Sequence, residues 1–180
     1  MHCLYLCGPN KQNEPLKMEL RHWTLSDKME LTNLCNAVDR HYLSDRLPNP
    51  YTKKDAEEWL KMVSENEAIT GIYWAIVCDG KLIGSISVKK KDDDAEIGYM
   101  ILNEYTNKGI ATEAVKQICS IAFKALSIEQ ITANVFQPNI ASIRVLLKNG
   151  FKYKGTIPNA VIKDGNVYDL LIYVLTKETR

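Results

Sequence analysis

One polar turn constrains the fold of this chain more than any other segment. It has the sequence Asn-Lys-Gly at positions 107–109, follows the apolar run Ile97–Leu102 and precedes a stretch with apolar residues at helical spacing. The first turn of a helix has unpaired backbone N–H groups and a partial positive charge, which together favour an anion. Gly109 leaves room for close approach, and Lys108 adds a mobile positive charge. The pattern predicts a strand, a turn able to cradle a pyrophosphate, and then a helix.

Two interpretations of this turn stay open at the level of sequence. Strand–turn–helix connections with a glycine are common in α/β proteins, and most of them bind nothing. The turn also lies outside two familiar classes of nucleotide site, because neither G-x-x-x-x-G-K-[ST] nor G-x-G-x-x-G occurs in the chain. The choice between an anion site and a plain connection therefore depends on the rest of the sequence.

The composition is that of one soluble globular domain. The chain has 180 residues, 46% hydrophobic and 25% charged, and its net charge of +1 gives no bulk attraction to nucleic acid or to a membrane. No apolar run approaches the ~18 residues that a membrane span needs. Five cysteines without a C-x-x-C pair and three scattered histidines indicate no metal site, and this cysteine usage favours a reducing cytoplasm. We expect residues 1–17 to be an N-terminal extension, disordered or an added arm, and residues 18–180 to form the domain.

The pattern of apolar residues predicts a series of strands and helices. Asp79-Gly80 and Asp164-Gly165 are two-residue hairpin signals. The expected strands are 18–23, 71–78, 81–89, 94–102, 130–136, 151–161 and 166–175, and the expected helices begin near 26, 52, 109 and 139. This order, β-α-α-β-β-β-α-β-α-β-β, predicts a single domain of mixed α/β class.

Three segments resemble, in their order and spacing, the successive core motifs of the GNAT acyltransferase superfamily. They are 95–102, 107–114 and 139–151, and the resemblance spans residues 18–177. They look most like the branch of ribosomal-protein N-terminal acetyltransferases, the RimJ/RimL type. The resemblance implies a central mixed, mostly antiparallel, twisted sheet of about seven strands with helices on both faces. It also implies an acetyl-CoA-dependent N-acetyltransferase whose acceptor amine attacks the thioester directly in a ternary complex.

The same resemblance implies where acetyl-CoA binds. Backbone amides of the turn would hold the pyrophosphate, although Thr106 stands where the family often has Gln or Arg. A bulge in the strand 98–102 would free backbone groups for the pantetheine arm, and one freed N–H could polarise the thioester oxygen. Asn139 would contact this arm, and Ser142 would lie near the sulfur. The implied coenzyme-binding residues are Met100, Ile101, Leu102, Asn107, Lys108, Gly109, Ile110, Ala111, Thr112, Asn139 and Ser142.

Glu96 is the candidate general base. Strand alternation places it with Gly98 and Met100 on one face of the sheet. A carboxylate inside a mostly apolar strand is costly unless it is paired, hydrated or functional, and partial burial would suit it to proton transfer. In the alternative interpretation, Glu96 lies at a solvated strand start and pairs with a lysine.

Ser142 is the second candidate catalytic residue, because a hydroxyl near the sulfur could hydrogen-bond the departing thiolate. The alternative is structural: Asn139 caps a helix, and Ser142 is the third residue after the cap. Some members of the family carry a Tyr where this chain has Leu146, or a Glu where it has Asn134. Neither group is present here, so the role of the acid is assigned to Ser142 by default.

The acceptor amine is expected to contact the least regular segments, which are 41–43 with Tyr51, and 159–165. The acceptor would be a peptide N-terminus or a small molecule such as a polyamine, an aminoglycoside or an amino acid. An α-amine has a pKa of ~7.7–8.0, so a weak base suffices for it, whereas a lysine-type amine is charged at pH 7. A coenzyme-binding module without turnover is the alternative from another class. We expect a monomer or homodimer, with no metal and no direct contact with nucleic acid or membrane.

Overall fold

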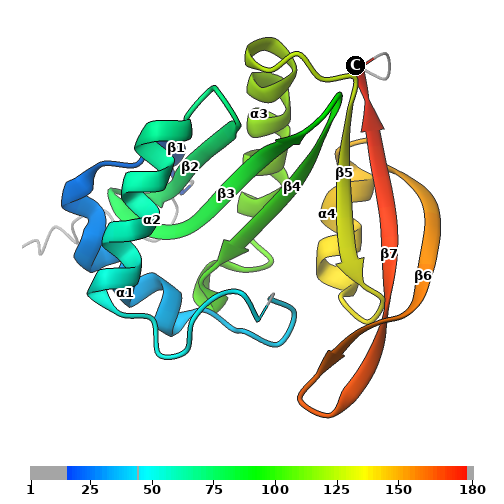
Figure 1. Cartoon of the computed structure of the whole chain (residues 1–180), viewed down its shortest axis with the longest axis horizontal. Helices are drawn as coiled ribbons and strands as arrows, with labels where there is room; N and C mark the ends of the chain where they lie inside the picture. The colour runs from blue at the N-terminus through cyan, green and yellow to red at the C-terminus, as the bar shows by residue number, and fades with distance from the viewer. Residues whose placement is uncertain (1–15, 44, 178–180) are drawn as a thin grey trace, which may run out of the picture.

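The computed structural model describes residues 16–43 and 45–177, and it shows one seven-stranded sheet with helices packed against it (Figure 1). The predicted single α/β domain with a mixed sheet is confirmed. Most of the expected N-terminal extension, residues 1–15, lies outside the described residues. The strands are β1 (Met18–His22), β2 (Gly71–Cys78), β3 (Lys81–Lys91), β4 (Asp94–Ile101), β5 (Gln130–Phe136), β6 (Lys152–Lys163) and β7 (Asn166–Thr176). The helices are α1 (Lys28–Ala37), α2 (Lys53–Asn66), α3 (Ile110–Ala125) and α4 (Ile140–Lys148), with short 3-10 turns η2 (Leu25–Asp27) and η3 (Asn103–Tyr105).

The sheet contains one parallel junction, and it divides the molecule. The strand order is β1-β2-β3-β4-β5-β7-β6, and every neighbouring pair is antiparallel except β4 and β5. These two strands pair only from Asp94–Glu96 to Gln130–Thr132. Beyond Glu96 their backbones diverge, and we call the region between the two diverging strands the wedge (Figure 1).

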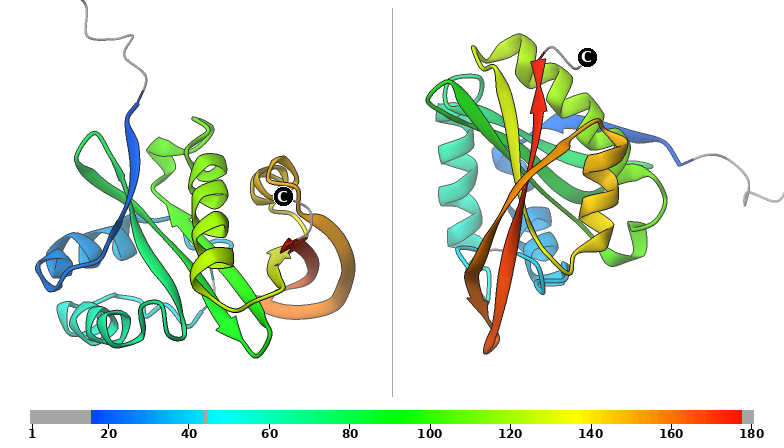
Figure 2. Two further views of the ribbon diagram at one scale, coloured as in Figure 1. Left: turned by 90° about the horizontal axis from the view of Figure 1, so that it is seen from above. Right: turned by 90° about the vertical axis from the view of Figure 1, so that its right-hand side faces the viewer.

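Helices cover both faces of the sheet, as the sequence predicts. Leu31 of α1 and Leu60 of α2 pack with Tyr73 of β2 in one buried cluster. Ile118 of α3 packs with Ile86 of β3 in a second cluster on the opposite face. Figure 2 shows α1 and α2 on one side of the sheet and α3 on the other. The two clusters hold β4 between them, so its alternate side chains point into different environments.

Local signals in the sequence explain where several elements begin. α2 starts with a reciprocal capping box, in which Asp55 N–H donates to the Thr52 hydroxyl (3.2 Å) and Thr52 N–H donates to the Asp55 carboxylate (2.7 Å). The β2–β3 hairpin turns at Asp79 and Gly80, which have φ values of 49° and 78°, as a two-residue turn of this kind requires. These predictions are confirmed.

The start of α1 differs from the prediction. The helix begins at Lys28 instead of near residue 26, because Leu25–Asp27 form a 3-10 turn. In this turn the Asp27 carboxylate accepts a hydrogen bond from the Thr24 N–H at 2.8 Å. It also accepts two from the Arg21 guanidinium, each at 2.8 Å. The chain therefore enters α1 through a charged capping contact made to β1.

The bulge expected in the strand 98–102 is absent, and this part of the prediction is wrong. β4 pairs with β3 in one continuous register, from Lys91 opposite Asp94 to Gly84 opposite Ile101. The register instead shifts between β2 and β3, where Ile83 is the extra residue. Because a Cβ at Gly84 would lie only 2.5 Å from the Met100 carbonyl oxygen, the missing side chain lets β3 and β4 approach closely.

Candidate functional site

The polar turn forms the connection that the sequence predicts. Asn107 and Gly109 both adopt left-handed conformations, with φ of 58° and 79°, and Gly109 is the N-cap of α3. Within the described residues no side chain caps this helix, and its first turn closes with the Glu113 N–H on the Gly109 carbonyl at 3.1 Å. The N–H groups of Ile110, Ala111 and Thr112 therefore have no partner inside the helix. This end of α3 can bind an anion through backbone donors.

Lys108 is exposed on the same turn, and its ammonium lies 5.3 Å from the centre of the Tyr105 ring. A cation over an aromatic face is attracted by the ring quadrupole, weakly at an exposed site. This contact keeps the charged end of Lys108 near the start of α3 while leaving it accessible. The turn thus combines a fixed set of N–H donors with one adjustable positive charge.

The backbone groups of β4 that a bulge was expected to free are instead free because β4 has no partner strand at the wedge. From Ile97 to Ile101, β4 pairs with β3 on one edge only, so groups on its other edge face the wedge. Leu102 is different, because its N–H donates to the Ile83 carbonyl and its carbonyl accepts from the Tyr105 N–H, both at 2.9 Å. Of the three residues predicted here, Met100 and Ile101 belong to the open stretch, while the backbone of Leu102 is already engaged.

Glu96 stands where β4 and β5 part. It is the last residue of β4 that pairs with β5, opposite Thr132, and it lies opposite Lys89 on β3. Its side chain is exposed, so the partial burial expected for it is not observed. Among the described residues it has no ion-pair partner. The continuous register keeps Glu96 in phase with Met100, which packs against the cluster of α1 and α2, so its carboxylate points to that face of the sheet.

Ser142 and Asn139 lie at the start of α4, as predicted. Asn139 is the N-cap, and its side-chain oxygen accepts the Ser142 N–H at 3.1 Å. The Ser142 hydroxyl also makes a contact that the sequence analysis misses, a 2.8 Å hydrogen bond with the Tyr99 hydroxyl of β4. Tyr99 packs against the cluster of α3 and α4, and burial raises the pKa of Tyr99 to about 12. Tyr99 lies three positions after Glu96 on a predicted strand, so its side chain points to the opposite face of the sheet. This alternation is the sequence signal that could have identified it.

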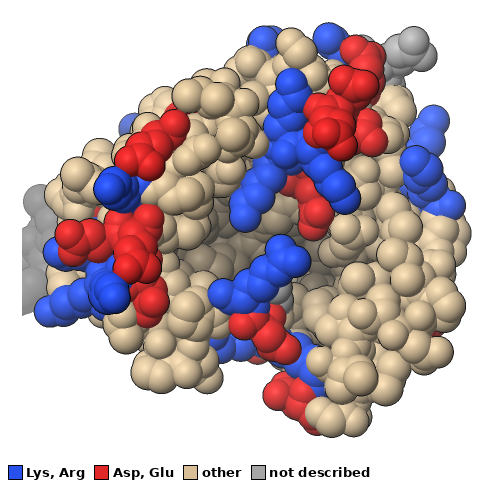
Figure 3. Space-filling view, in the orientation of Figure 1, with Lys and Arg blue, Asp and Glu red and all other residues tan. Residues whose placement is uncertain are grey.

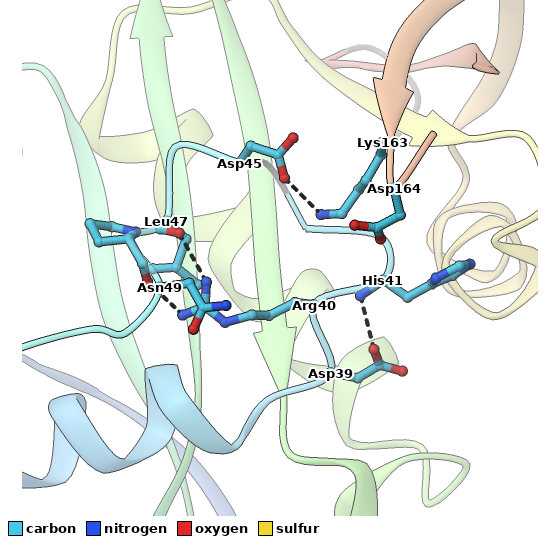
Figure 4. A pocket seen from close by; sticks show the side chains of 9 residues that line it. Asp39, Arg40, His41, Asp45, Leu47, Asn49, Lys163 and Asp164 are labelled. Atoms are coloured by element: carbon cyan, nitrogen blue, oxygen red, sulfur yellow. Dashed lines mark hydrogen bonds and ion pairs between the residues drawn. The ribbon is translucent and has the colours of Figure 1, made fainter. Parts of the chain in front are cut away.

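A pocket of about 420 Å³ opens between the α1–α2 connection and the β6–β7 hairpin (Figure 4). Lys163 at the end of β6 is only 7% exposed, donates to the Leu43 carbonyl and pairs with Asp45 at 3.2 Å. These contacts join two segments that the sequence analysis assigns to the acceptor. The pocket is lined by Asp39, Arg40, His41, Asp45, Leu47, Pro48, Asn49, Lys163 and Asp164. Figure 3 shows this face of the molecule as hollowed, with charged side chains of both signs around the hollow.

Aromatic rings line the adjoining end of β5. Phe136 contacts Tyr42 with ring centres 5.7 Å apart and Tyr168 at 5.6 Å, and His41 meets Tyr42 edge-on at 4.4 Å. Tyr51, which the sequence analysis also assigns to the acceptor region, is instead 5% exposed in the cluster of α1 and α2. Its N–H bonds the Asn36 side chain at 2.9 Å, so Tyr51 is a core residue.

The described part of the chain contains no group of three His, Cys, Asp or Glu side chains placed to hold a metal ion. Nor does any helix within 16–43 and 45–177 have the length and apolar character needed to cross a membrane.

Comparisons with known proteins agree with this architecture. A family model described as "Acetyltransferase (GNAT) domain" matches residues 17–152. The uncharacterized N-acetyltransferase YoaA of Bacillus subtilis (strain 168) is 39% identical over 112 residues, which are 59% of this chain and 63% of that protein. YdaF of the same organism, named as a candidate ribosomal N-acetyltransferase, is 29% identical over 130 residues, 71% of this chain and 69% of YdaF.

A solved structure shares the complete fold. RimL, a ribosomal L7/L12 α-N-protein acetyltransferase in complex with coenzyme A, matches this chain with a TM-score of 0.80 and 17% sequence identity. The match covers 91% of this chain and 96% of RimL, so the two proteins share the same overall fold.

Proposed function

This chain belongs to the GNAT acetyltransferase family, and from that membership we propose that it transfers the acetyl group of acetyl-CoA to a primary amine. The observation that carries the proposal is the divergence of β4 and β5 directly after Glu96. It creates an opening with an anion-binding turn at one end and a carboxylate at the other. The diphosphate of the coenzyme would bind at Asn107–Thr112, and its arm would follow β4 towards Glu96.

The proposed reaction needs no covalent enzyme intermediate. The neutral amine attacks the thioester carbon, so a C–N bond forms and the carbonyl oxygen gains negative charge. An unpaired N–H on the wedge side of β4 would stabilise that oxygen. The C–S bond then breaks, and its electron pair stays on sulfur, near Ser142. The proton lost by the amine goes to Glu96, directly or through water, because this exposed carboxylate faces the acceptor side of the sheet.

We infer that the acceptor is a protein N-terminal α-amine. The exposed position of Glu96 suits a weak base, and an α-amine with a pKa of ~7.7–8.0 needs only a weak base. The hollowed, charged face in Figure 3 offers room for an extended peptide end. The likeness to YdaF and the shared fold with RimL support a ribosomal protein as the bearer of that amine.

A small amine is the second candidate, and one observation favours it. The pocket beside the β6–β7 hairpin has a volume of about 420 Å³, within the range of small-molecule sites. Its wall carries the carboxylates of Asp39, Asp45 and Asp164 against the two cations Arg40 and Lys163, and this excess of negative charge would attract a cationic amine. A panel containing both peptides and small amines decides between the two acceptor classes.

Binding of the coenzyme is the first test. Acetyl-CoA at 100 times its dissociation constant should raise the free energy of unfolding by about 2.7 kcal/mol, because it binds only the folded state. The measurement is thermal unfolding with increasing acetyl-CoA. An unchanged midpoint at millimolar acetyl-CoA would contradict the proposed function in every form, including a coenzyme-binding module without turnover.

The second test concerns the role of Glu96 as the general base. Glu96→Gln should lower kcat by roughly 10²-fold at pH 7 while leaving the affinity for acetyl-CoA unchanged, because only the general base is removed. The loss of kcat relative to wild type should become smaller as the pH rises past ~8, because a growing share of an α-amine is already neutral there. Release of free thiol, followed with the acceptor panel, measures both effects. Glu19→Gln is the matched control, because Glu19 is an exposed strand glutamate on β1. Equal rates for Glu96→Gln and wild type would exclude Glu96 as the base.

A further inference from the structure

A single hydrogen bond between two hydroxyl groups connects β4 to α4. The Tyr99 hydroxyl of β4 lies 2.8 Å from the Ser142 hydroxyl of α4, the helix that follows β5 in the chain. Both side chains are half-buried. In such surroundings a hydrogen bond is electrostatically stronger than in water, so this contact orders both groups.

The position of Tyr99 along β4 places this pair beside the path from the turn to Glu96. Tyr99 is three residues from Glu96, about 10 Å along a strand, and is separated from Gly109 by the end of β4 and η3. A coenzyme arm that starts at the turn and ends near Glu96 therefore passes the level of Tyr99. The Tyr99 ring packs against the cluster on the α3 and α4 side, opposite to the acceptor face where Glu96 points.

A hydroxyl has one hydrogen to donate and two lone pairs to accept. If Tyr99 donates to the Ser142 oxygen, the single hydrogen of Ser142 stays available for another acceptor. The raised pKa of Tyr99 keeps its phenol protonated through the neutral range. Without Tyr99, the Ser142 hydroxyl can turn to the backbone carbonyl of a residue three or four positions before it, as serines in helices do. The Asn139 oxygen fixes the Ser142 backbone but leaves its side chain free to rotate.

We propose that Tyr99 is a positioning residue that directs the Ser142 hydroxyl at the coenzyme sulfur, so that the two hydroxyls form one chain of donors to the departing thiolate. The proposal rests on the proposed function, because it requires the coenzyme arm in the wedge. No proton needs to leave either hydroxyl. The C–S electron pair stays on sulfur, Ser142 donates a hydrogen bond to it, and Tyr99 holds Ser142 in the donating orientation.

This arrangement predicts a property of bound coenzyme A that needs no acceptor to measure. Donors aimed at sulfur favour the thiolate over the thiol, so the thiol of bound coenzyme A should ionise at a lower pH than the ~8.5 of a free thiol. Coenzyme A should then bind more tightly as the pH rises through the ionisation of the bound thiol. Desulfo-coenzyme A, which lacks the sulfur, should show no such rise.

The experiment compares the dissociation constants of coenzyme A and desulfo-coenzyme A at pH 6.5 and pH 9.0, under reducing conditions. In the wild type, the preference for coenzyme A should increase roughly tenfold over this range, the size expected for a hydrogen bond to a charged group. Tyr99→Phe should lose most of the increase and Ser142→Ala all of it. The double variant should match Ser142→Ala, because Tyr99 acts only through Ser142.

Tyr153→Phe is the matched control. The Tyr153 hydroxyl also lies 2.8 Å from another hydroxyl, that of Thr156, but both are exposed on β6. This variant should keep the wild-type preference and its dependence on pH. Thermal unfolding of each variant without ligand checks that folding is retained, and binding of desulfo-coenzyme A checks that the wedge is intact.

The possible outcomes separate this inference from the proposed function. If neither ligand binds the wild type, the proposed function fails, and the inference fails with it. If both bind but the preference is independent of pH, or if Tyr99→Phe keeps the full increase, only the role of Tyr99 is excluded. If Tyr99→Phe tightens both ligands equally, the hydroxyl pair merely closes the wedge, and the proposal is overturned.

Discussion

At the scale of single residues, strand alternation on β4 separates two kinds of chemistry. Glu96 points to the face covered by α1 and α2, while Tyr99 points to the face covered by α3 and α4. A one-residue bulge between them would reverse this relation, because side chains alternate with a period of two. The continuous β3–β4 register is therefore what would allow one strand to serve both the amine and the thiolate in the proposed reaction.

Asp27 provides a prediction about stability at this scale. It is only 6% exposed, and burial alone would raise the pKa of its carboxyl. The hydrogen bonds from Arg21 and Thr24 outweigh burial and lower the pKa of Asp27. Asp27→Asn should therefore reduce the free energy of unfolding by about 2 kcal/mol near pH 7.

The dependence on pH follows from the direction of this shift. Because the folded pKa is lowered, the stabilisation by Asp27 is complete above the unfolded value of ~3.9 and is lost as the pH falls through the folded value. The difference in the free energy of unfolding between Asp27→Asn and wild type should thus be smaller in acid. Urea unfolding near pH 7 and near pH 3 measures it. Asp93→Asn is the control, since Asp93 is exposed beyond β3. A gap that stays constant with pH would contradict the proposed charge effect.

At the scale of elements, the sequence predicts what depends on neighbouring residues and misses what depends on distant ones. The two Asp-Gly hairpins and the start of α2 are local, and they are found where expected. The position of the bulge depends on how β3 packs between its two neighbouring strands. The pattern of apolar residues along β4 carries no information about that packing. The exposure of Glu96 and the burial of Tyr51 likewise depend on which parts of β4 and of the α1–α2 connection are covered.

Gly84 gives a test of the β3–β4 register. Gly84→Ala should lower the free energy of unfolding by about 1–3 kcal/mol, because the new Cβ would lie 2.5 Å from the Met100 carbonyl oxygen and force the strands apart. Gly98→Ala is the matched control on the paired strand, where an added Cβ meets no atom within 4 Å. That change should be neutral or stabilising by up to about 1 kcal/mol, because alanine has less freedom to lose in a strand than glycine. Equal denaturation midpoints for the two variants would contradict this account of the close approach.

At the scale of the whole molecule, two segments that are far apart in the sequence meet at the pocket of about 420 Å³. The α1–α2 connection and the β6–β7 hairpin are far apart in sequence and are joined through Lys163, whose ammonium bonds Leu43 and Asp45 (Figure 4). The ring contacts among His41, Phe136 and Tyr168 add to this junction. The shape of this pocket, the proposed acceptor site, therefore depends on contacts between two separate segments.

Lys163→Ala should loosen this junction. Removing the ammonium leaves the Leu43 carbonyl and the Asp45 carboxylate without this partner, so the amides of 39–47 and 160–168 should exchange hydrogen faster. KM for the acceptor should rise, while KM for acetyl-CoA should stay unchanged because the contacts of Lys163 are with Leu43 and Asp45 and not with the turn at 107–109. Hydrogen–deuterium exchange measures the first effect and steady-state kinetics the second. Lys154→Ala, at an exposed position on β6, is the control, and wild-type exchange rates in Lys163→Ala would refute the role of the junction.

Only three residue pairs of the sheet join its first four strands to its last three. Each part keeps its own ladder of hydrogen bonds, so the twist of one part can change without breaking the hydrogen bonds of the other. We expect the fluctuations of the native state to be smallest at Ala95 and Ile131, inside the paired stretch, and to grow towards the far ends of β4 and β5. The width of the gap between these two strands is then adjustable, and a molecule bound there would set it.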